Sequence, residues 1–368
     1  MITGPLFSGR LALQQRVLPS YRVPFFDMLA SVCEGGLSVF AGLPRAGEGI
    51  ENDRLQIAEH VAARNIHILQ GPFYLCYQRG LIRWLESSNS DVLIVEANPR
   101  YLATPSAVQW MHARGRKVIG WGLGAPPLSG PLDGLRQTKR IQFLSQFDAL
   151  IAYSRRGAAE YADQGFARER IFTAFNAVSA RPSSPLPPRP ALFKDKPTIL
   201  FVGRLQARKR VGDLLRTCSE MELKSRLILV GDGPEREHLE TLAKRVYPSA
   251  EFVGAKYGAE LKRYFTEADL FVLPGTGGLA VQEAMSYGLP IIVAKGDGTQ
   301  DDLVRESNGW QIPAQDYEAL VRTMRFALSD VERLRRMGRE SYRIVSEEIN
   351  LEKMVEMFVR VLNGLTPR

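Results

Sequence analysis

Short runs of apolar residues alternate with amphipathic stretches along most of the 368-residue chain. In the first half, runs typical of buried strands cover residues 11–16, 37–42, 65–70, 91–97, 117–122, 149–154 and 171–176. The spacing of apolar residues between them predicts helices, including 74–86, 102–114 and 132–147. Continuous apolar strands separated by helices are typical of a parallel sheet that is covered on both faces.

Residues 181–197 interrupt this pattern with the sequence RPSSPLPPRPALFKDKP. Its prolines exclude a helix or a central strand, so we interpret it as an interdomain linker. The alternation then resumes, with strands predicted at 198–203, 226–231, 250–254, 270–274, 290–294 and 309–312. Helices are predicted at 211–220, 234–246, 259–267, 279–287 and 317–328, and the amphipathic tail of about 330–364 is also helical.

The pattern therefore predicts an α/β protein with two doubly wound, Rossmann-like domains that face a central cleft. We expect an N-terminal domain at 1–180, the linker at 181–197, a C-terminal domain at 198–348, and a helix at 349–368 that packs back on the N-terminal domain. Doubly wound sheets bind ligands at the carboxyl ends of their strands, so functional residues are expected in the loops that follow strands.

The net charge of the chain and its distribution indicate which classes of partner the protein binds. The net charge is +8, and residues 1–185 carry 20 Lys and Arg against 14 Asp and Glu, which is +6 of that total. A basic surface suits phosphate-bearing substrates or an anionic membrane face. No run of five or six like charges and no nucleic-acid-reading motif is present, so we expect no nucleic-acid partner.

The three cysteines, Cys33, Cys76 and Cys218, lie far apart and lack zinc-ligand spacing. We interpret them as reduced core residues of a cytoplasmic protein and expect no metal site. The N-terminus lacks a basic segment followed by an apolar stretch, and no run of 18 apolar residues exists. These features predict neither a signal peptide nor a membrane span, and they leave peripheral docking on the inner face of the membrane open.

A cationic segment directly follows the first strand of the second half. Residues 203–210 read GRLQARKR and place four cations within seven residues where a helix begins. A helix N-terminus carries partial positive charge, so these cations cost stability unless an anion is bound. A diphosphate would meet Arg204, Lys209 and free backbone N–H groups together. A solvated basic loop is the alternative.

A glycine-rich turn ends the strand at 270–274 and leads into a helix that contains Glu283. Glycines let a ligand approach the backbone closely. The carboxylate of Glu283 is suited to accept hydrogen bonds from vicinal hydroxyls such as a ribose diol; alternatively, it only complements the helix dipole. The turn at 230–235, VGDGPE, is explained by Gly-Pro opening a helix, although its glycines are also placed to line a nucleotide pocket.

Taken together, these segments resemble the retaining family-four glycosyltransferases of the GT-B fold. The resemblance rests on five ordered segments, FVGRLQARKRVGDLL, LVGDGPEREHL, EFVGAKYGAELKRYFTEADLFVLPG, VQEAMSYGLPIIV and SNGWQIP. FNAVS at 175–179 also resembles the family's Asn-Gly-Val segment, with Ala177 in place of the glycine. The first 170 residues match only in architecture.

The resemblance implies a nucleotide-diphosphate-sugar donor, without cofactor or metal, and we favour a UDP-sugar over a GDP-sugar. It assigns the diphosphate to Arg204 and Lys209 and the ribose to Glu283. Further donor contacts would come from Gly203, Gly231, Val253, Gly254, Thr276, Gly277, Gly278 and Leu279. The implied reaction transfers a hexosyl or related group to a hydroxyl with retention, in polysaccharide, lipid-linked glycan or glycoconjugate synthesis.

One position departs from the family. Family members usually carry two glutamates separated by seven residues in this loop; Glu283 is the second, and Gly275 occupies the place of the first. Because the first glutamate normally contacts the donor sugar, the identity of the sugar is open. Asp297, Asp301 and Asp302 are candidates to compensate, with solvated loop acids as the alternative.

The resemblance assigns the acceptor, a glycan or a lipid-linked molecule, to the N-terminal domain. Residues at or after its strand ends that are candidates to face the cleft are Arg16, Tyr21, Arg22, Glu96, Trp121 and Gly122. Trp121 would stack on a sugar or, equally, lie in the core, and Glu96 would offer a carboxylate to the acceptor hydroxyl. Two rival functions stay open: a sugar-nucleotide epimerase and a transferase-derived binding protein without turnover.

Overall fold

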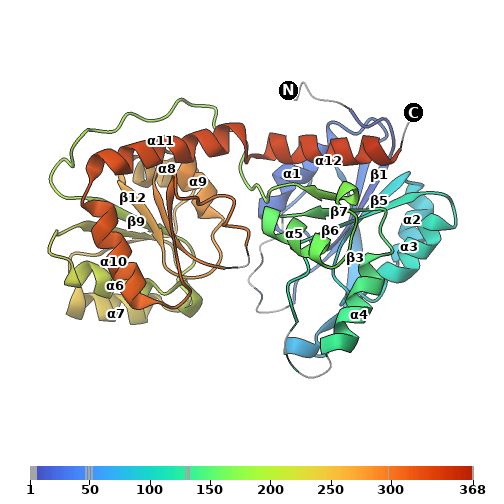
Figure 1. The fold of residues 1–368 in the computed structure, drawn as a ribbon, viewed down its shortest axis with the longest axis horizontal. Helices are drawn as coiled ribbons and strands as arrows, with labels where there is room; N and C mark the ends of the chain where they lie inside the picture. Colours follow the sequence, from blue (N-terminus) through green and yellow to red (C-terminus); the bar gives the residue numbers. More distant parts are fainter. Residues whose placement is uncertain are drawn as a thin grey trace. The chain divides into compact units, whose positions relative to one another are not determined.

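The computed structural model describes residues 6–45, 48, 50, 53–128, 130, 133–296 and 298–366. The chain forms two compact units, Met1–Ala180 with Leu351–Arg368, and Arg181–Asn350. Figure 1 shows a sheet flanked by helices in each unit. The predicted class, α/β with two doubly wound Rossmann-like units, is confirmed.

The N-terminal unit contains an eight-stranded sheet with the order β4-β3-β2-β1-β5-β6-β7-β8. Its strands are β1 (Leu11–Val17), β2 (Leu37–Gly42), β3 (Glu59–Ile68), β4 (Leu75–Arg79), β5 (Val92–Glu96), β6 (Lys117–Gly122), β7 (Ala149–Ala152) and β8 (Ile171–Thr173). Neighbouring strands are parallel except β3 and β4, which are antiparallel. Strand order reverses between β1 and β5, which makes their carboxyl ends the topological switch point of this sheet.

Helices cover both faces of this sheet because its inner strands are apolar on both sides. They are α1 (Val23–Ala30), α2 (Leu81–Ser88), α3 (Thr104–His112), α4 (Asp133–Leu144), α5 (Arg155–Asp163) and α12 (Leu351–Leu365), with short 3-10 turns η1 (Ser20–Arg22), η2 (Gly71–Phe73) and η3 (Arg168–Arg170). On one face, Phe25 of α1 packs edge-on against Phe358 of α12, with ring centroids 5.0 Å apart. On the other, Trp84 of α2 stacks on Phe40 of β2.

The region 59–88 differs from the sequence prediction. A strand at 65–70 and a helix at 74–86 were expected, whereas β3 begins at Glu59, and β4 and α2 replace the single helix. Residues 75–79 alternate between buried and exposed positions, a period of two that fits a strand. Gly80 then adopts φ 93°, which separates β4 from α2.

The C-terminal unit contains a six-stranded parallel sheet with the order β11-β10-β9-β12-β13-β14. Its strands are β9 (Thr198–Val202), β10 (Arg226–Val230), β11 (Glu251–Gly254), β12 (Leu270–Leu273), β13 (Ile291–Ala294) and β14 (Gly309–Ile312). Its helices are α6 (Val211–Glu220), α7 (Arg236–Val246), α8 (Gly258–Glu267), α9 (Ala280–Ser286), α10 (Tyr317–Leu328) and α11 (Val331–Glu347), with the 3-10 turn η4 (Ala207–Lys209). The strand order reverses between β9 and β12, so the loops after these two strands meet at the switch point.

Residues 181–197 have no helix or strand, yet they are held against the C-terminal unit. The guanidinium of Arg189 donates to the carbonyl oxygens of Phe265 (3.0 Å) and Tyr287 (2.8 Å). Arg335 of α11 donates to the carbonyl of Pro190 at 2.8 Å. This proline-rich segment therefore forms part of the surface of the unit rather than a freely extended tether.

The helical tail is divided where the chain returns to the N-terminal unit. Asn350, a buried residue that follows α11 in the chain, donates through Nδ2 to the carbonyl of Val345 at 2.9 Å. The N–H of Leu351 then donates to the carbonyl of Ser179 at 3.0 Å.

The three cysteines are buried and free, as expected of core residues.

Candidate functional site

Three loops at the carboxyl edge of the C-terminal sheet are joined by backbone hydrogen bonds. The N–H of Gly203 donates to the carbonyl of Val230 (3.0 Å), and that of Leu205 donates to the carbonyl of Asp232 (2.8 Å). The N–H of Gly231 donates to the carbonyl of Gly254 (2.9 Å). The loops after β9, β10 and β11 therefore form one connected surface.

Gly231 is required for this close approach. It adopts φ 143°, and a Cβ at this position would lie 1.9 Å from the carbonyl oxygen of Gly203. A larger residue would push the loops after β9 and β10 apart. Close packing of the two loops therefore explains why position 231 is a glycine. Its neighbours at the loop surface stay candidates for donor contacts.

The four cations of the segment 203–210 have different surroundings. Arg210 pairs with Asp213, with 2.5 Å between Nη2 and Oδ2, so its charge is neutralised within α6. Arg204 is exposed at the end of β9, and its guanidinium has no hydrogen bond or ion pair within the described part of the chain. Arg208 is also exposed and bonds to the Gln206 side chain at 2.9 Å. Only Lys209 is buried.

Lys209 connects the loop after β9 with the loop after β12. Its Nζ donates to the carbonyl oxygen of Thr276 at 2.8 Å, across the switch point of the sheet. Burial, and secondarily the charge of Arg208, lowers the pKa of the Lys209 amine to about 8. The structure thus places a desolvated cation beside the glycine-rich turn, where an incoming anion would strengthen its charged form.

Arg208 is a further cation at this turn that the sequence did not single out as a site residue. A Cβ built on Gly277 would lie 3.2 Å from Nη1 of Arg208 and 3.3 Å from Nζ of Lys209. Gly277 also adopts φ 73°, a conformation that favours glycine. The only sequence signal for Arg208 was its membership of the cationic run, because nothing in the spacing indicates which side chains face the turn.

Gly275 has no room for a side chain. A Cβ at this position would lie 2.1 Å from the carbonyl oxygen of Arg208 and 2.5 Å from the Cα of Lys209. The N–H of the next residue, Thr276, donates to that same carbonyl at 3.1 Å. In this loop conformation, the place of the family's first glutamate is occupied by the backbone of the cationic segment.

Glu283 lies on α9, just beyond the glycine-rich turn, and is half-buried. Burial raises the pKa of its carboxyl group above the usual value. Its carboxylate has no hydrogen-bond or ion-pair partner among the residues that the structure describes. Leu279 and Thr276 are exposed, Gly278 is half-buried, and Val253 and Gly254 are half-buried at the end of β11.

The acidic residues proposed to compensate for Gly275 are placed differently from one another. Asp297 lies outside the described residues. Asp302 is buried and Asp301 is half-buried. Asp301 lines a pocket of about 630 Å³ beside β13 and β14, together with Lys295 and Trp310.

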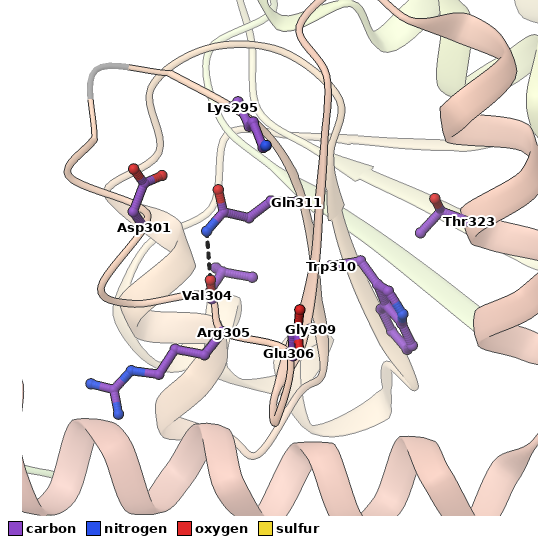
Figure 2. Close-up of a pocket in the computed structure, with 9 residues that line it drawn as sticks. All are labelled: Lys295, Asp301, Val304, Arg305, Glu306, Gly309, Trp310, Gln311 and Thr323. Carbon is purple, nitrogen blue, oxygen red and sulfur yellow. Dashed lines mark hydrogen bonds between the residues drawn. The ribbon is translucent and has the colours of Figure 1, made fainter. Parts of the chain in front are cut away.

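Figure 2 shows this pocket, in which Gln311 donates to the carbonyl of Val304 at 2.7 Å. Trp310 and Gln311 extend to opposite sides of β14. Its lining includes Asp301, a candidate to compensate for Gly275, but none of the residues that the sequence assigned to the diphosphate, the ribose or the acceptor. It is therefore separate in composition from the loops at the switch point.

In the N-terminal unit, Arg16 and Glu96 meet at the switch point between β1 and β5. The backbone N–H of Arg16 donates to Oε2 of Glu96 at 2.5 Å, while its guanidinium pairs with Glu48 at 2.9 Å. Desolvation raises the pKa of Glu96 to about 7, despite that hydrogen bond and the nearby charges of Arg16 and Arg22. The structure thus brings together two of the residues predicted on the acceptor side.

Arg22 forms the centre of a second group, with aromatic side chains around it. Its guanidinium carbon lies 4.8 Å from the ring centroid of Trp121, 5.3 Å from that of Tyr21 and 5.4 Å from that of Tyr153. It also donates to Oδ1 of Asn176 at 2.5 Å. Arg22 is buried and Tyr21 is partly exposed, so Arg22 ties the segment after β1 to the segment after β8.

Trp121 is fully buried and packs edge-on against Phe358, with ring centroids 5.1 Å apart. Stacking on a sugar ring needs an exposed aromatic face, so this placement favours the core alternative. Gly122 is also buried, and a Cβ there would lie 2.8 Å from the hydroxyl of Tyr161. Both residues shape the end of β6 from inside the unit.

We expect the raised pKa of Glu96 to make stability depend on pH. The unfolded carboxyl ionises near pH 4.3, whereas the native one stays protonated until about pH 7, so the unfolded state loses its proton first. The stabilisation contributed by the protonated Glu96 is therefore fully present below pH 4 and decreases as pH rises to 7, by about 3 kcal/mol. Glu96→Gln should flatten this decrease in thermal melts from pH 5 to 8.

Glu48→Gln is the matched control, because its shift has the opposite sign. Burial alone would raise the pKa of Glu48, but hydrogen bonds from Arg16 and Arg45 hold it at about 2. The ionised carboxylate of Glu48 stabilises the folded state at pH values above the pKa that this group has in the unfolded chain. Glu48→Gln should therefore lower stability at neutral pH. Identical pH profiles for Glu96→Gln and the parent would contradict the assignment.

Comparison with known proteins identifies the class of the fold and finds a family match over part of the chain. The solved structure of Anabaena HepE in complex with UDP is similar to this chain, with a TM-score of 0.70 and 16% identity, covering 96% of this chain and 99% of that one. The likeness establishes the GT-B fold, to which the two Rossmann-like units belong.

Residues 185–344 match the family described as Glycosyl transferases group 1. This match covers less than half of the chain and lies within the C-terminal unit, and the predicted resemblance to GT-B glycosyltransferases is confirmed.

Curated relatives match part of the chain. The Arabidopsis thaliana sulfoquinovosyl transferase SQD2 is 34% identical over 144 residues, which cover 38% of this chain and 28% of that protein. A GDP-mannose-dependent alpha-mannosyltransferase of Mycobacterium tuberculosis is 36% identical over 126 residues, covering 33% of this chain and 32% of that protein. The chain thus aligns with less than two thirds of the length of either relative.

Proposed function

We propose that this chain is a glycosyltransferase that moves a glycosyl group from a nucleotide-diphosphate-sugar to a hydroxyl acceptor, with retention of configuration. The observation that carries this proposal is the position of Lys209, whose amine donates to the carbonyl of Thr276 at 2.8 Å across the switch point. Arg204 follows the end of β9 at the same edge of the sheet. A diphosphate has the charge and the number of acceptor oxygens that these two cations need.

In this proposal, each site residue acts through charge or position. Arg204 and Lys209 hold the diphosphate and stabilise the negative charge that it gains as the glycosidic bond breaks. Glu283 accepts hydrogen bonds from the ribose diol, and the backbone at Gly277 and Gly278 approaches the donor sugar. The leaving phosphate takes the proton of the acceptor hydroxyl, so catalysis rests on positioning and electrostatics without a metal ion.

The same proposal extends to the identity of the donor and of the acceptor. We favour a UDP-sugar and transfer of a hexosyl group; the UDP complex of the similar HepE structure supports this, while the mannosyltransferase relative makes GDP-mannose the necessary comparison. We propose a glycan or lipid-linked acceptor bound by the N-terminal unit, at a cytoplasmic, peripheral membrane location. The epimerase and the binding protein without turnover have no support from the relatives.

A thermal-shift screen against nucleotides and sugar nucleotides tests the donor assignment. A ligand that binds the native state at about 100 times its Kd stabilises it by about 2.7 kcal/mol, so the donor should raise the melting temperature measurably. UDP, GDP and their sugars form the panel, and the Arg204→Ala variant serves as the control that should show a smaller shift. If no nucleotide diphosphate shifts the parent protein, the proposal fails.

We expect donor affinity to decrease as pH rises above 8. The amine of Lys209 has a pKa of about 8 in the free protein, and the bound diphosphate favours its charged form. Above pH 8, binding must therefore take up a proton, and the Kd should rise by up to about tenfold per pH unit until the pKa of the complex is reached. Calorimetry from pH 7 to 9.5 measures this rise, which should be absent in Lys209→Ala.

A further inference from the structure

An apolar and basic face is formed on one side of the β3–β4 hairpin. In the antiparallel register, Arg64 is opposite Arg79, and Ile66 is opposite Tyr77. Cys76 of β4 also bridges in parallel to Tyr101, and Leu102 donates to the carbonyl of Cys76 at 2.9 Å. Because Cys76 and Tyr101 are buried, their neighbours on each strand point outward.

The outward side chains are unusually apolar for an exposed surface. Ile66, Tyr77 and Leu102, which lie side by side across three segments, are 40%, 43% and 42% exposed. The turn between the two strands adds Leu69 at 63% and Phe73 at 75%. Single exposed apolar residues are common, but a contiguous group of them at an edge of a sheet indicates a contact surface.

The charge on this face has one sign. The outward positions are 60, 62, 64, 66 and 68 on β3, 75, 77 and 79 on β4, and 100 and 102 beside it; three are arginines and none is acidic. Arg64 and Arg79 are exposed and lie directly opposite each other, without an ion pair among the described residues. Like charges in directly opposite positions of a ladder are destabilising unless an anion lies between or above them.

We propose that this surface, which we call the hairpin face and define by Arg64, Ile66, Ile68, Tyr77, Arg79 and Leu102, docks on an anionic phospholipid bilayer. The arginines would meet lipid phosphates, while Phe73 and Leu69 of the turn enter the boundary between headgroups and acyl chains. The N-terminal half carries a net +6 of the chain's charge, which adds long-range attraction. None of the helices that the structure describes is long and apolar enough to cross the bilayer.

Charge favours a lipid surface over a second copy of the chain. Pairing two hairpin faces would bring arginines of both copies onto one interface that contains no carboxylate at its outward positions. An anionic bilayer supplies the missing negative charge and accepts the apolar turn in one contact. Docking of the hairpin face rests on the peripheral membrane location proposed above and uses none of the residues assigned to the donor.

Co-sedimentation with vesicles of 30% phosphatidylglycerol and 70% phosphatidylcholine tests the hairpin face with the full-length chain. The parent should bind these vesicles at low salt, bind pure phosphatidylcholine weakly, and dissociate as salt rises. Arg64→Glu/Arg79→Glu should weaken binding by about tenfold or more, because each cation near the surface contributes about fivefold. Phe73→Ser should weaken it severalfold.

Matched controls lie in the other unit. Arg322→Glu changes an exposed cation of α10, and Leu192→Ser removes an aliphatic side chain that is 74% exposed. Both should bind vesicles like the parent. Binding that decreases equally in Arg64→Glu/Arg79→Glu and Arg322→Glu would overturn the proposal, because net charge rather than this face would then explain it.

A fluorescent probe locates the contact directly. The native cysteines are buried, so Phe73→Cys is labelled selectively with an environment-sensitive dye. Anionic vesicles should increase its emission, whereas a label at Leu192→Cys should not respond; sedimentation without a response at residue 73 would overturn the proposal.

A dimer in light scattering that Arg64→Glu/Arg79→Glu abolishes would assign the face to self-association instead. Nucleotide-induced thermal shifts should be equal in all these variants, which separates this inference from the proposed function.

Discussion

Lys209→Ala and Arg204→Ala should each lower the turnover of glycosyl transfer by about 100- to 1000-fold. Lys209 provides a buried cation that donates to the carbonyl of Thr276 at 2.8 Å, and Arg204 provides an exposed cation at the end of β9. The diphosphate gains charge as it leaves, so removing either cation weakens the transition state more than the bound donor. Steady-state kcat and KM with the donor found by thermal shift measure the effect.

The control for these variants is Arg216→Ala, which removes a cation that is half exposed on α6 and pairs with Asp213. It should keep near-normal turnover, and all three variants should show the circular dichroism of the parent. The double variant should lose less than the product of the single effects, because the two cations act on one leaving group. Near-normal transfer by both single variants would contradict the phosphate clamp.

Gly275→Ala, and more strongly Gly275→Glu, should destabilise the C-terminal unit and weaken donor binding. The added Cβ would lie 2.1 Å from the carbonyl oxygen of Arg208 and 2.5 Å from the Cα of Lys209, so the backbone has to move. Overpacking of this kind costs about 1–3 kcal/mol. The displacement also separates Thr276 from the Lys209 amine, which should raise the Kd for the donor by about two orders of magnitude.

The Gly275→Glu variant restores the residue that family members usually carry at this place, so it distinguishes two explanations of the departure. If the loop in this chain is built around the glycine, the variant loses both stability and donor affinity. If the loop relaxes and the glutamate reaches the donor sugar, affinity or turnover increases, and the packing explanation is wrong. Gly134→Ala on α4, where a Cβ meets nothing within 4 Å, is the control for replacing a glycine.

The β3–β4 hairpin shows that a hydrophobic pattern alone does not distinguish a short strand from a helix. Residues 75–79 were predicted as the start of a helix because apolar residues recur across 74–86, and the two periods overlap in so short a segment. Antiparallel pairing with β3 stabilises residues 75–79 as a strand. Without that pairing, the opposition of Arg64 and Arg79 and the apolar group beside them are not visible in the sequence.

The sequence by itself determined the α/β class, the two-unit organisation, the cationic segment after β9, the glycine-rich turn before α9 and the resemblance of the C-terminal unit to GT-B glycosyltransferases. These features depend on local spacing, which period and composition record directly. Only the tertiary structure decided that Lys209 reaches Thr276, that Arg210 is neutralised by Asp213, and that Trp121 is buried against Phe358. It also decided that Gly275 has no room for a side chain. Such outcomes depend on which distant segments meet, since packing and desolvation are properties of neighbours in space and not of neighbours along the chain.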